Sequence, residues 1–244
     1  MTGKTHETGG MFASLLGFAI LKEGGYLLED SNLLVQWMVM YPFTMWGSVA
    51  SDLDHHWKSC PRKDYPSRLV NMALHITKPI EEHTNKGSVV NKVAGVLNAS
   101  HRSWQTHSDF TLIFLFGLLY LLTHGVFSCF SAVDSRILLL VLMGITMGVA
   151  EHFILDMLTP EGITLIGLVI LETLLKKVNP RIKLPTKLKF VPKSHFFATG
   201  QEWEKFVQKV LKIATYLMLV WFLISFLTSS GVFDITHITS LVNE

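Results

Sequence analysis

Histidine and aspartate side chains gather in four short stretches of this chain, and imidazole and carboxylate groups are common protein ligands of zinc and related divalent metals. The stretches are TH at residues 5–6, SDLDHH at 51–56, HRSWQTHS at 101–108 and EHFILD at 151–156. Together they hold more ligand residues than the four that one tetrahedral zinc ion needs. The surplus favours two or three ions with bridging carboxylates, an arrangement suited to hydrolysis of phosphate esters.

His152 and Asp156 are four residues apart, so they share one face of a helix. They fall in the last turns of an apolar stretch at 137–158, where an ionisable side chain is costly and is therefore a candidate functional residue. The alternative is a hydrogen-bonded pair that only holds the end of the helix. Glu151 points in another direction, and it either supports a ligand or caps neighbouring polar groups.

Asp52, Asp54 and His55 follow directly after an apolar stretch at 32–50. If that helix continues, Asp52 and His55 share a face and Asp54 points elsewhere. Carboxylates are unfavourable at a helix C-terminus, because the helix dipole is negative there, and a bound cation would offset that cost. The alternative is a solvated helix end.

His101 and His107 do not share a helix face, so a turn must bring them together. Arg102 lies between them and suits an anionic oxygen, because a guanidinium can bind phosphate or carboxylate through two hydrogen bonds. Thr106 and Ser108 could orient the imidazole rings. The alternative is a polar turn at the membrane interface, just before the apolar stretch at 110–129.

The composition indicates a membrane protein. Apolar residues make up 49% of the 244 residues and charged residues only 16%, a low charge content for a soluble protein. Since about 20 apolar residues cross a bilayer as a helix, we predict an all-α, polytopic membrane protein with about five transmembrane helices and a single domain over residues 1–244. The predicted crossings are 11–28, 32–50 with a kink at Pro42, 110–129, 137–158 and 213–228. Residues 163–171 are too few to cross and suit a re-entrant or interfacial segment.

Basic residues predict the orientation. Of 21 lysines and arginines, eight lie in 51–109 and ten in 172–212, and an excess of basic residues marks cytoplasmic segments. With five crossings, this rule places the N-terminus inside the cell and the C-terminus outside. All four ligand-rich stretches then lie on the cytoplasmic side, and His6 joins the candidate site through this argument.

The order of these motifs resembles the YdjM-like family of membrane-bound metal-dependent hydrolases, of the LexA-regulated inner-membrane type. The matching elements run from Thr5-His6 through SDLDH at 51–55, the His-Arg and Thr-His-Ser elements of 101–108 and His152-x-x-x-Asp156 to TPEG at 159–162 and TGQEWE at 199–204. The turn between His101 and His107 is one residue longer than the family pattern. The His-x-x-x-Asp pair is also similar to a motif of zinc-dependent phospholipase C.

The resemblance implies a set of functional residues. The implied metal ligands are His6, Asp52, Asp54, His55, His101, His107, His152 and Asp156. The implied catalytic residues are Arg102, Asp54 and Glu204. The cofactor would be a divalent metal in two or more copies, zinc first and manganese as the alternative.

We therefore expect a multi-pass inner (cytoplasmic) membrane hydrolase whose active site faces the cytoplasm. Its partners would be the lipid bilayer and a phosphoester substrate such as a phospholipid or a polyprenyl phosphate. The net charge of +2 is too small to indicate a nucleic-acid partner. The alternative function is a divalent metal-ion transporter, or a metal-binding membrane protein without catalysis.

Overall fold

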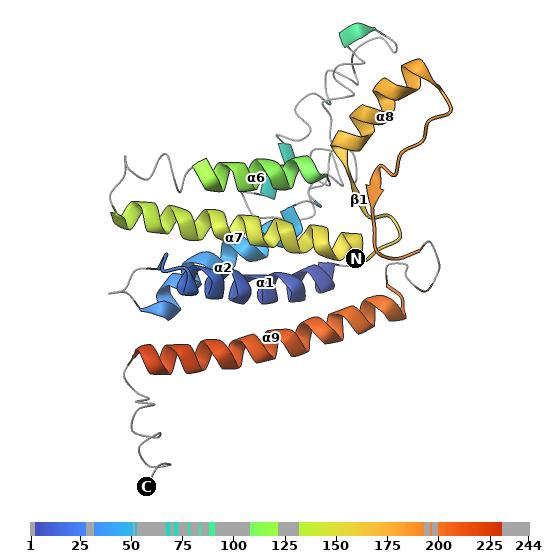
Figure 1. Cartoon of the computed structure of the whole chain (residues 1–244). Helices are drawn as coiled ribbons and strands as arrows, with labels where there is room; N and C mark the ends of the chain where they lie inside the picture. The colour runs from blue at the N-terminus through green and yellow to red at the C-terminus, as the bar shows by residue number, and fades with distance from the viewer. Residues whose placement is uncertain are drawn as a thin grey trace.

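The long apolar stretches of the chain fold into helices. The computed structural model describes residues 3–27, 32–50, 52, 67–68, 71–72, 78, 83, 88–90, 108–121, 132–192, 196 and 200–230. Within them lie helices α1 (Gly3–Glu23), α2 (Leu33–Ala50), α6 (Asp109–Leu121), α7 (Ala132–Met157), α8 (Ile166–Val178) and α9 (Glu202–Ser229), with strands β1 (Ile163–Thr164) and β2 (Lys187–Leu188) (Figure 1). The prediction of a mainly helical protein is confirmed.

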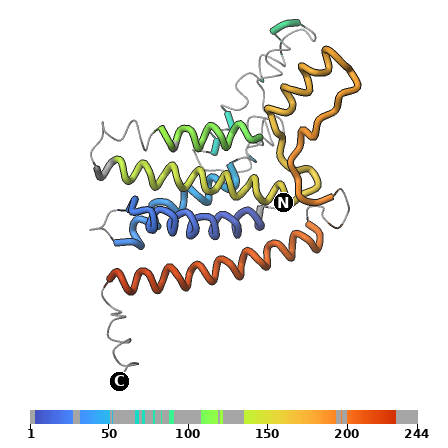
Figure 2. Tube along the Cα trace, in the orientation of Figure 1, coloured from blue at the N-terminus to red at the C-terminus, as the bar shows by residue number. Residues whose placement is uncertain are grey.

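Five of these helices form a bundle. α1, α2, α6, α7 and α9 lie side by side with nearly parallel axes, whereas α8 projects away from them (Figures 1 and 2). α1 contacts α2, α7 and α9, and α7 also contacts α2 and α6. The chain runs up and down, so the starts of α1, α6 and α9 and the ends of α2 and α7 lie at one end of the bundle (Figure 2). We call this the site end, because the ligand-rich stretches at 5–6 and 151–156 belong to it.

The central contact, between α2 and α7, depends on glycine. A Cβ atom at Gly148 would overlap the backbone of α2 at Thr44 and Ser48, and one at Gly144 would lie 2.7 Å from the main-chain oxygen of Met40. Gly144 and Gly148 are four residues apart on one helix face, the small-residue pattern that lets membrane helices approach closely. The backbones of α2 and α7 therefore touch without intervening side chains.

Apolar side chains pack the rest of the bundle. Phe18 of α1 is fully buried and meets Phe222 of α9 edge-on, with ring centroids 5.6 Å apart. The buried cluster around them consists of Leu15, Leu21, Leu27, Met40, Leu139, Leu140 and Met143. These contacts join α9 to the rest of the bundle through α1.

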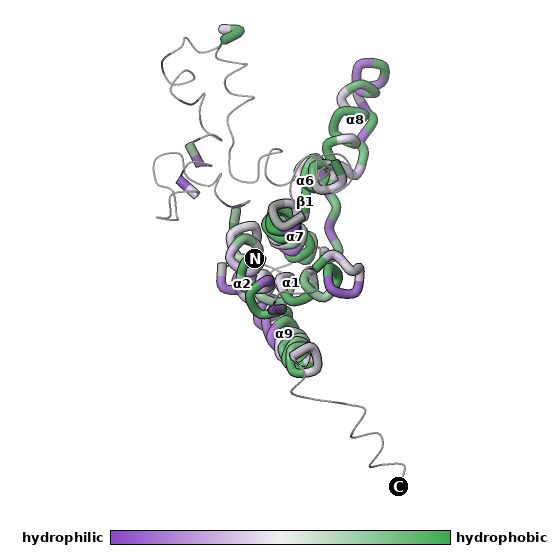
Figure 3. Tube along the Cα trace, turned by 90° about the vertical axis from the view of Figure 1, so that its left-hand side faces the viewer, coloured by the Kyte–Doolittle hydropathy of each residue, from purple (hydrophilic) through white to green (hydrophobic). Residues whose placement is uncertain are grey.

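Two helices among the described residues are long and apolar enough to cross a membrane, Ser135–Met157 and Glu202–Ser229. Asp109–Leu118 is a shorter apolar helix, and residues 122–129 of that predicted crossing lie outside the described residues. α2 is not one of these two, and it carries three polar residues, Gln36, Thr44 and Ser48, that are buried in the bundle. Hydrophobic residues dominate the tubes of α6, α7 and α9 in Figure 3. Five crossings stay a prediction.

The segment after α7 differs from its prediction in length. We predicted a short interfacial piece at 163–171, whereas α8 spans Ile166–Val178 and continues through Lys176 and Lys177. Its first turn begins where the Asp109 carboxylate accepts a hydrogen bond from the main-chain nitrogen of Ile166 (2.8 Å). A carboxylate satisfies a free N–H group and complements the dipole at a helix N-terminus, so Asp109 links the start of α6 to the start of α8.

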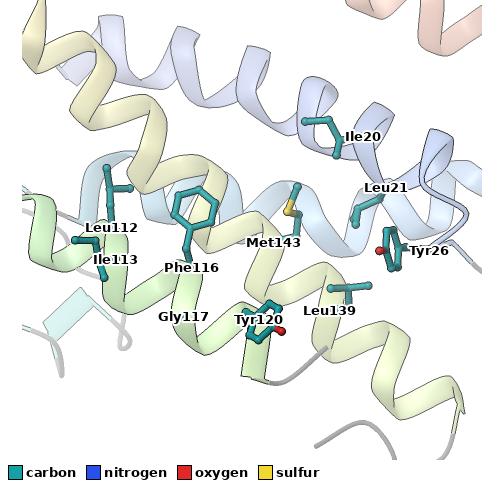
Figure 4. Close-up of a pocket in the computed structure, with 10 residues that line it drawn as sticks. All are labelled: Ile20, Leu21, Tyr26, Leu112, Ile113, Phe116, Gly117, Tyr120, Leu139 and Met143. Atoms are coloured by element: carbon teal, nitrogen blue, oxygen red, sulfur yellow. The ribbon is translucent and has the colours of Figure 1, made fainter. Parts of the chain in front are cut away.

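An apolar pocket of about 740 Å³ lies between α1, α6 and α7. Its lining side chains converge from the three helices (Figure 4). They are Ile20 and Leu21 at the end of α1, Tyr26 just after it, Leu112, Ile113, Phe116, Gly117 and Tyr120 of α6, and Leu139 and Met143 of α7. The pocket therefore lies toward the end of the bundle opposite the site end.

Candidate metal centre

Two buried histidines form the centre of the site end. His6 lies in the first turns of α1 and His152 in the last turns of α7. Their exposed fractions are 1% and 0%, and their rings stack with centroids 4.0 Å apart and planes inclined by 15°. The predicted meeting of these two residues is observed, although His6 belongs to a helix that begins at Gly3 rather than to a tail before residue 11.

Carboxylates face the Nε2 atom of His152. This nitrogen lies 3.7 Å from Oδ1 of Asp52 and 3.7 Å from Oδ2 of Asp156. Two ligand atoms that each lie about 2.1 Å from one zinc ion are roughly 3–4 Å apart, so both separations suit a shared ion. His6, Asp52 and His152 also offer ligand atoms that all lie within 4.8 Å of one another. Asp52 is the partly exposed member, at 39%, so the group is open to the outside on its side.

A main-chain oxygen fixes the imidazole of His152. The Nδ1 atom donates a hydrogen bond to the carbonyl oxygen of Ser48 over 2.7 Å, and a carbonyl oxygen can only accept. The proton of the neutral ring is therefore on Nδ1, and Nε2 presents its lone pair to the carboxylates. The contact places His152 in the form that binds a metal.

The end of α7 is held by several donors. Thr159 donates from its main-chain nitrogen (2.9 Å) and its hydroxyl (2.7 Å) to the main-chain oxygen of Asp156. Trp203 Nε1 donates to the oxygen of Leu158 (3.1 Å), and the nitrogen of Phe190 donates to the oxygen of Met157 (2.8 Å). Carbonyl groups at a helix C-terminus need such partners. These bonds fix the last turn of α7, from which the Asp156 side chain extends.

The TPEG element at 159–162 follows α7, and the structure explains why it ends in glycine. Gly162 has a φ of 62°, and a Cβ atom there would overlap the main-chain oxygen of Leu188 in β2. Only glycine combines that backbone conformation with so close an approach at little cost. β1 and β2 then pair antiparallel, with Ile163 opposite Leu188.

Glu204 contacts the site through Thr5. The Thr5 hydroxyl donates to Oε1 of Glu204 over 2.5 Å, and the main-chain nitrogen of Gly200 donates to Oε2 over 2.6 Å. Glu204 is buried in the first turn of α9. The contact with Thr5 holds the start of α1, and hence His6, against α9, which is the geometry of a positioning residue.

Glu151 is the residue whose role the sequence left open. Its side chain is 7% exposed, and Oε1 lies 3.7 Å from Nδ1 of His6. A Cβ atom at Gly9 would overlap this carboxylate, so the absence of a side chain at Gly9 makes room for it. The spacing of His6 and Gly9, one helical turn apart, is the sequence signal that could have indicated a neighbour on this face of α1.

The structure thus brings together four predicted ligands, His6, Asp52, His152 and Asp156. The other predicted site residues, Asp54, His55, His101, Arg102 and His107, lie outside the described residues. Ser108 is the last residue of the ligand-rich stretch at 101–108. It is fully buried and forms a β-bridge with Thr164.

An apolar helical bundle with a buried histidine–carboxylate group at one end defines the class, a helical membrane protein with a candidate divalent-metal centre. The model of the YdjM inner membrane protein family matches residues 1–232. The chain belongs to this family, so the resemblance found in its motifs is confirmed. The family and the two long apolar helices indicate an inner membrane protein. No curated protein and no solved structure is similar enough to match the chain.

Proposed function

We propose that this protein is a multi-pass inner membrane hydrolase that uses divalent metal ions to cleave a phosphoester of a lipid or of another substrate near the membrane. One observation carries the proposal. His6, Asp52 and His152 gather within 4.8 Å of one another in an apolar bundle, where ionisable side chains are costly and are generally retained for function.

The donor set suits a divalent transition metal. Two imidazoles with the carboxylates of Asp52 and Asp156 fit zinc, with manganese as the alternative. These four residues would take part in holding the metal ions, and the hydrogen bond from His152 to Ser48 keeps one imidazole in the ligand form. Bound there, such ions supply Lewis-acid polarisation of a phosphoryl oxygen and activation of water at neutral pH.

Further residues of the proposed site come from the sequence alone, because they lie outside the described residues. Asp54, His55, His101 and His107 would raise the ligand number to that of a dinuclear or trinuclear centre. Arg102 would bind the substrate phosphate through two hydrogen bonds and neutralise its charge. Asp54 and Glu204 keep the catalytic roles that the family resemblance implies, and Glu204 in addition positions Thr5.

Exposed basic residues support a cytoplasmic orientation of the site. Lys176, Lys177, Arg181, Lys183, Lys187 and Lys189 are exposed on the segment that follows α7. α7 ends at the metal-ligand group, so this segment begins at the site end. By the positive-inside rule, such a cluster favours the cytoplasmic side.

The position of the ligands favours hydrolysis over transport. A transporter binds its ions near the middle of the bilayer. His6 lies in the first turns of α1, and Asp52 comes two residues after the end of α2. This location at the helix ends suits a substrate that approaches from the headgroup region.

The test is release of phosphate, or of a phosphorylated headgroup, by the purified full chain in liposomes. The substrate panel contains phospholipids, polyprenyl phosphates and nucleotides, with zinc or manganese added and then removed by a chelator. We expect metal-dependent release that His152→Ala abolishes. Arg102→Lys should impair release while metal content stays nearly intact, and Arg181→Lys, on the exposed segment, serves as its matched control. No release across the panel, together with movement of divalent ions across the liposome membrane, would replace hydrolysis by transport.

A further inference from the structure

Glu151 is a buried carboxylate that the ligand group described above does not use. Neither of its oxygens has a hydrogen-bond partner among the described residues. Its side chain is 7% exposed and lies on α7, a helix long and apolar enough to cross a membrane. A buried acid in such a place normally carries a partner, because its desolvation is otherwise uncompensated.

The neighbour that faces Glu151 is a metal-ligand atom. Oε1 lies 3.7 Å from Nδ1 of His6, which is longer than a hydrogen bond. It falls in the range of roughly 3–4 Å expected for two atoms that bind the same ion at about 2.1 Å. Gly9 supplies the space, because any side chain there would overlap the carboxylate.

The ligand atoms divide into two adjacent groups, although His6 also offers an atom within 4.8 Å of those of Asp52 and His152. Asp52 and Asp156 face Nε2 of His152, whereas Glu151 faces Nδ1 of His6. The two rings stack with centroids 4.0 Å apart, so the two groups are adjacent. Metal ions in paired catalytic sites lie about 3.5–4 Å apart, and this arrangement suits such a pair.

We propose that Glu151 and His6 bind a second divalent cation, next to a first one held by His152, Asp52 and Asp156. Glu151 is thereby a metal ligand, and its carboxylate balances the charge of the added ion inside the apolar bundle. The inference rests on the proposed metal-dependent function, which it deepens by assigning ligands to each of two ions.

The test measures manganese binding to the full chain in detergent, without any substrate. The ion content per chain is determined by elemental analysis, and the magnetic coupling of neighbouring Mn²⁺ ions by electron paramagnetic resonance. We expect Glu151→Gln to bind one ion fewer than the unsubstituted chain and to lose the coupled signal. Glu151→Asp, which keeps the charge on a shorter side chain, should retain the second ion with weaker affinity.

Glu161→Gln is the matched control, because Glu161 is an exposed glutamate shortly after α7. It should leave ion number and coupling unchanged. The unfolding transition of each variant in detergent shows whether it is folded. If Glu151→Gln unfolds, the Glu151→Asp titration decides: unchanged affinity for every ion overturns the proposal, and a selective loss for one ion supports it.

Other outcomes separate this inference from the proposed function. An unchanged ion number in folded Glu151→Gln overturns the inference, as does an equal weakening of all ions, which would make Glu151 a positioning residue for His6. A coupled manganese pair that depends on Glu151, in a protein that hydrolyses no phosphoester, supports the inference and contradicts only the hydrolase proposal.

Discussion

The Nδ1 atom of His152 lies 2.7 Å from the main-chain oxygen of Ser48 and thereby joins α7 to α2 at the site end. A main-chain oxygen of α2 thus determines the tautomer of a side chain on α7. No side-chain substitution at Ser48 removes that acceptor, so the metal-binding form of His152 depends on the packing of the two helices rather than on one side chain.

Replacing His152 and Asp156 together by alanine should lower the divalent metal content of the purified protein. Both are buried, and Nε2 and Oδ2 lie 3.7 Å apart, as ligands of one ion do. Elemental analysis after dialysis is the measurement, and His83→Ala, at an exposed position, is the control. Unchanged metal content in the double variant would remove this pair from the site.

Thr5→Val should weaken both the stability of the bundle and the affinity for metal. The substitution preserves shape but leaves the buried Glu204 carboxylate without the hydroxyl that lies 2.5 Å from it. Loss of a hydrogen bond to a buried charged group costs roughly 1–3 kcal/mol. Denaturation in detergent and a zinc titration measure the two effects.

Thr8→Val is the control for that experiment, since the Thr8 hydroxyl donates only within α1, to the main-chain oxygen of Lys4. Equal effects of the two substitutions would show that the contact between α1 and α9 does not matter for metal binding.

The sequence predicted those parts of the site that a single helix determines. His152 and Asp156 follow from a spacing of four residues, and the apolar stretches gave the approximate bounds of α2 and α7. The contact of Glu151 with His6 was beyond such reasoning, because it joins α7 to α1 and depends on the space at Gly9.

The start of α1 was missed for a related reason. Its first residues, from Gly3 to Thr8, are polar and include no apolar repeat, so local propensity and hydrophobicity gave no helix there. The bond between Thr5 and Glu204 joins residues 199 positions apart. Tertiary contacts of this kind stabilise a helical turn that the local sequence does not favour.

Gly148→Ala should destabilise the bundle. The new Cβ atom would overlap the backbone of α2 and push α2 away from α7, and such overpacking costs roughly 1–3 kcal/mol. Gly167→Ala is the matched control, since nothing lies within 4 Å of a Cβ atom there. Thermal unfolding in detergent compares the two, and equal stability would contradict direct contact of the helix backbones.

The predicted orientation can be tested with single cysteines in a chain whose Cys60 and Cys129 are replaced by serine. Lys187→Cys, exposed on β2, should be protected from a membrane-impermeant thiol reagent in intact cells. Ser230→Cys, at the end of α9, should react. Labelling at position 187 from outside would reverse the proposed topology.

The carboxylate of Glu172 should give a small pH dependence to the segment after α8. A hydrogen bond from Lys176 and a second one from the main-chain nitrogen of Leu184 hold the pKa of Glu172 below its ordinary value of 4.5. Because the folded pKa is lowered, this stabilisation is present above pH 4.5 and is lost as the pH falls through the folded pKa.

Hydrogen exchange of the Leu184 amide, corrected for its intrinsic rate, is the measurement. We expect Glu172→Gln to speed exchange at pH 7, and the difference from the unsubstituted chain to shrink as the pH falls through the folded pKa. A difference that does not shrink in an acid titration that protonates the carboxylate would mean that the ionised carboxylate is not the acceptor that matters.

The glycine contact between α2 and α7 also bears on how ions enter and leave. With their backbones in contact at Gly144 and Gly148, the two helices should resist sliding past each other, so the residues at their ends should keep their spacing. Asp52 is the proposed ligand on the partly exposed side. Rotation of this one side chain would then be the gate for exchange, so the rate of metal release should follow substitutions at Asp52 more closely than substitutions that loosen the bundle.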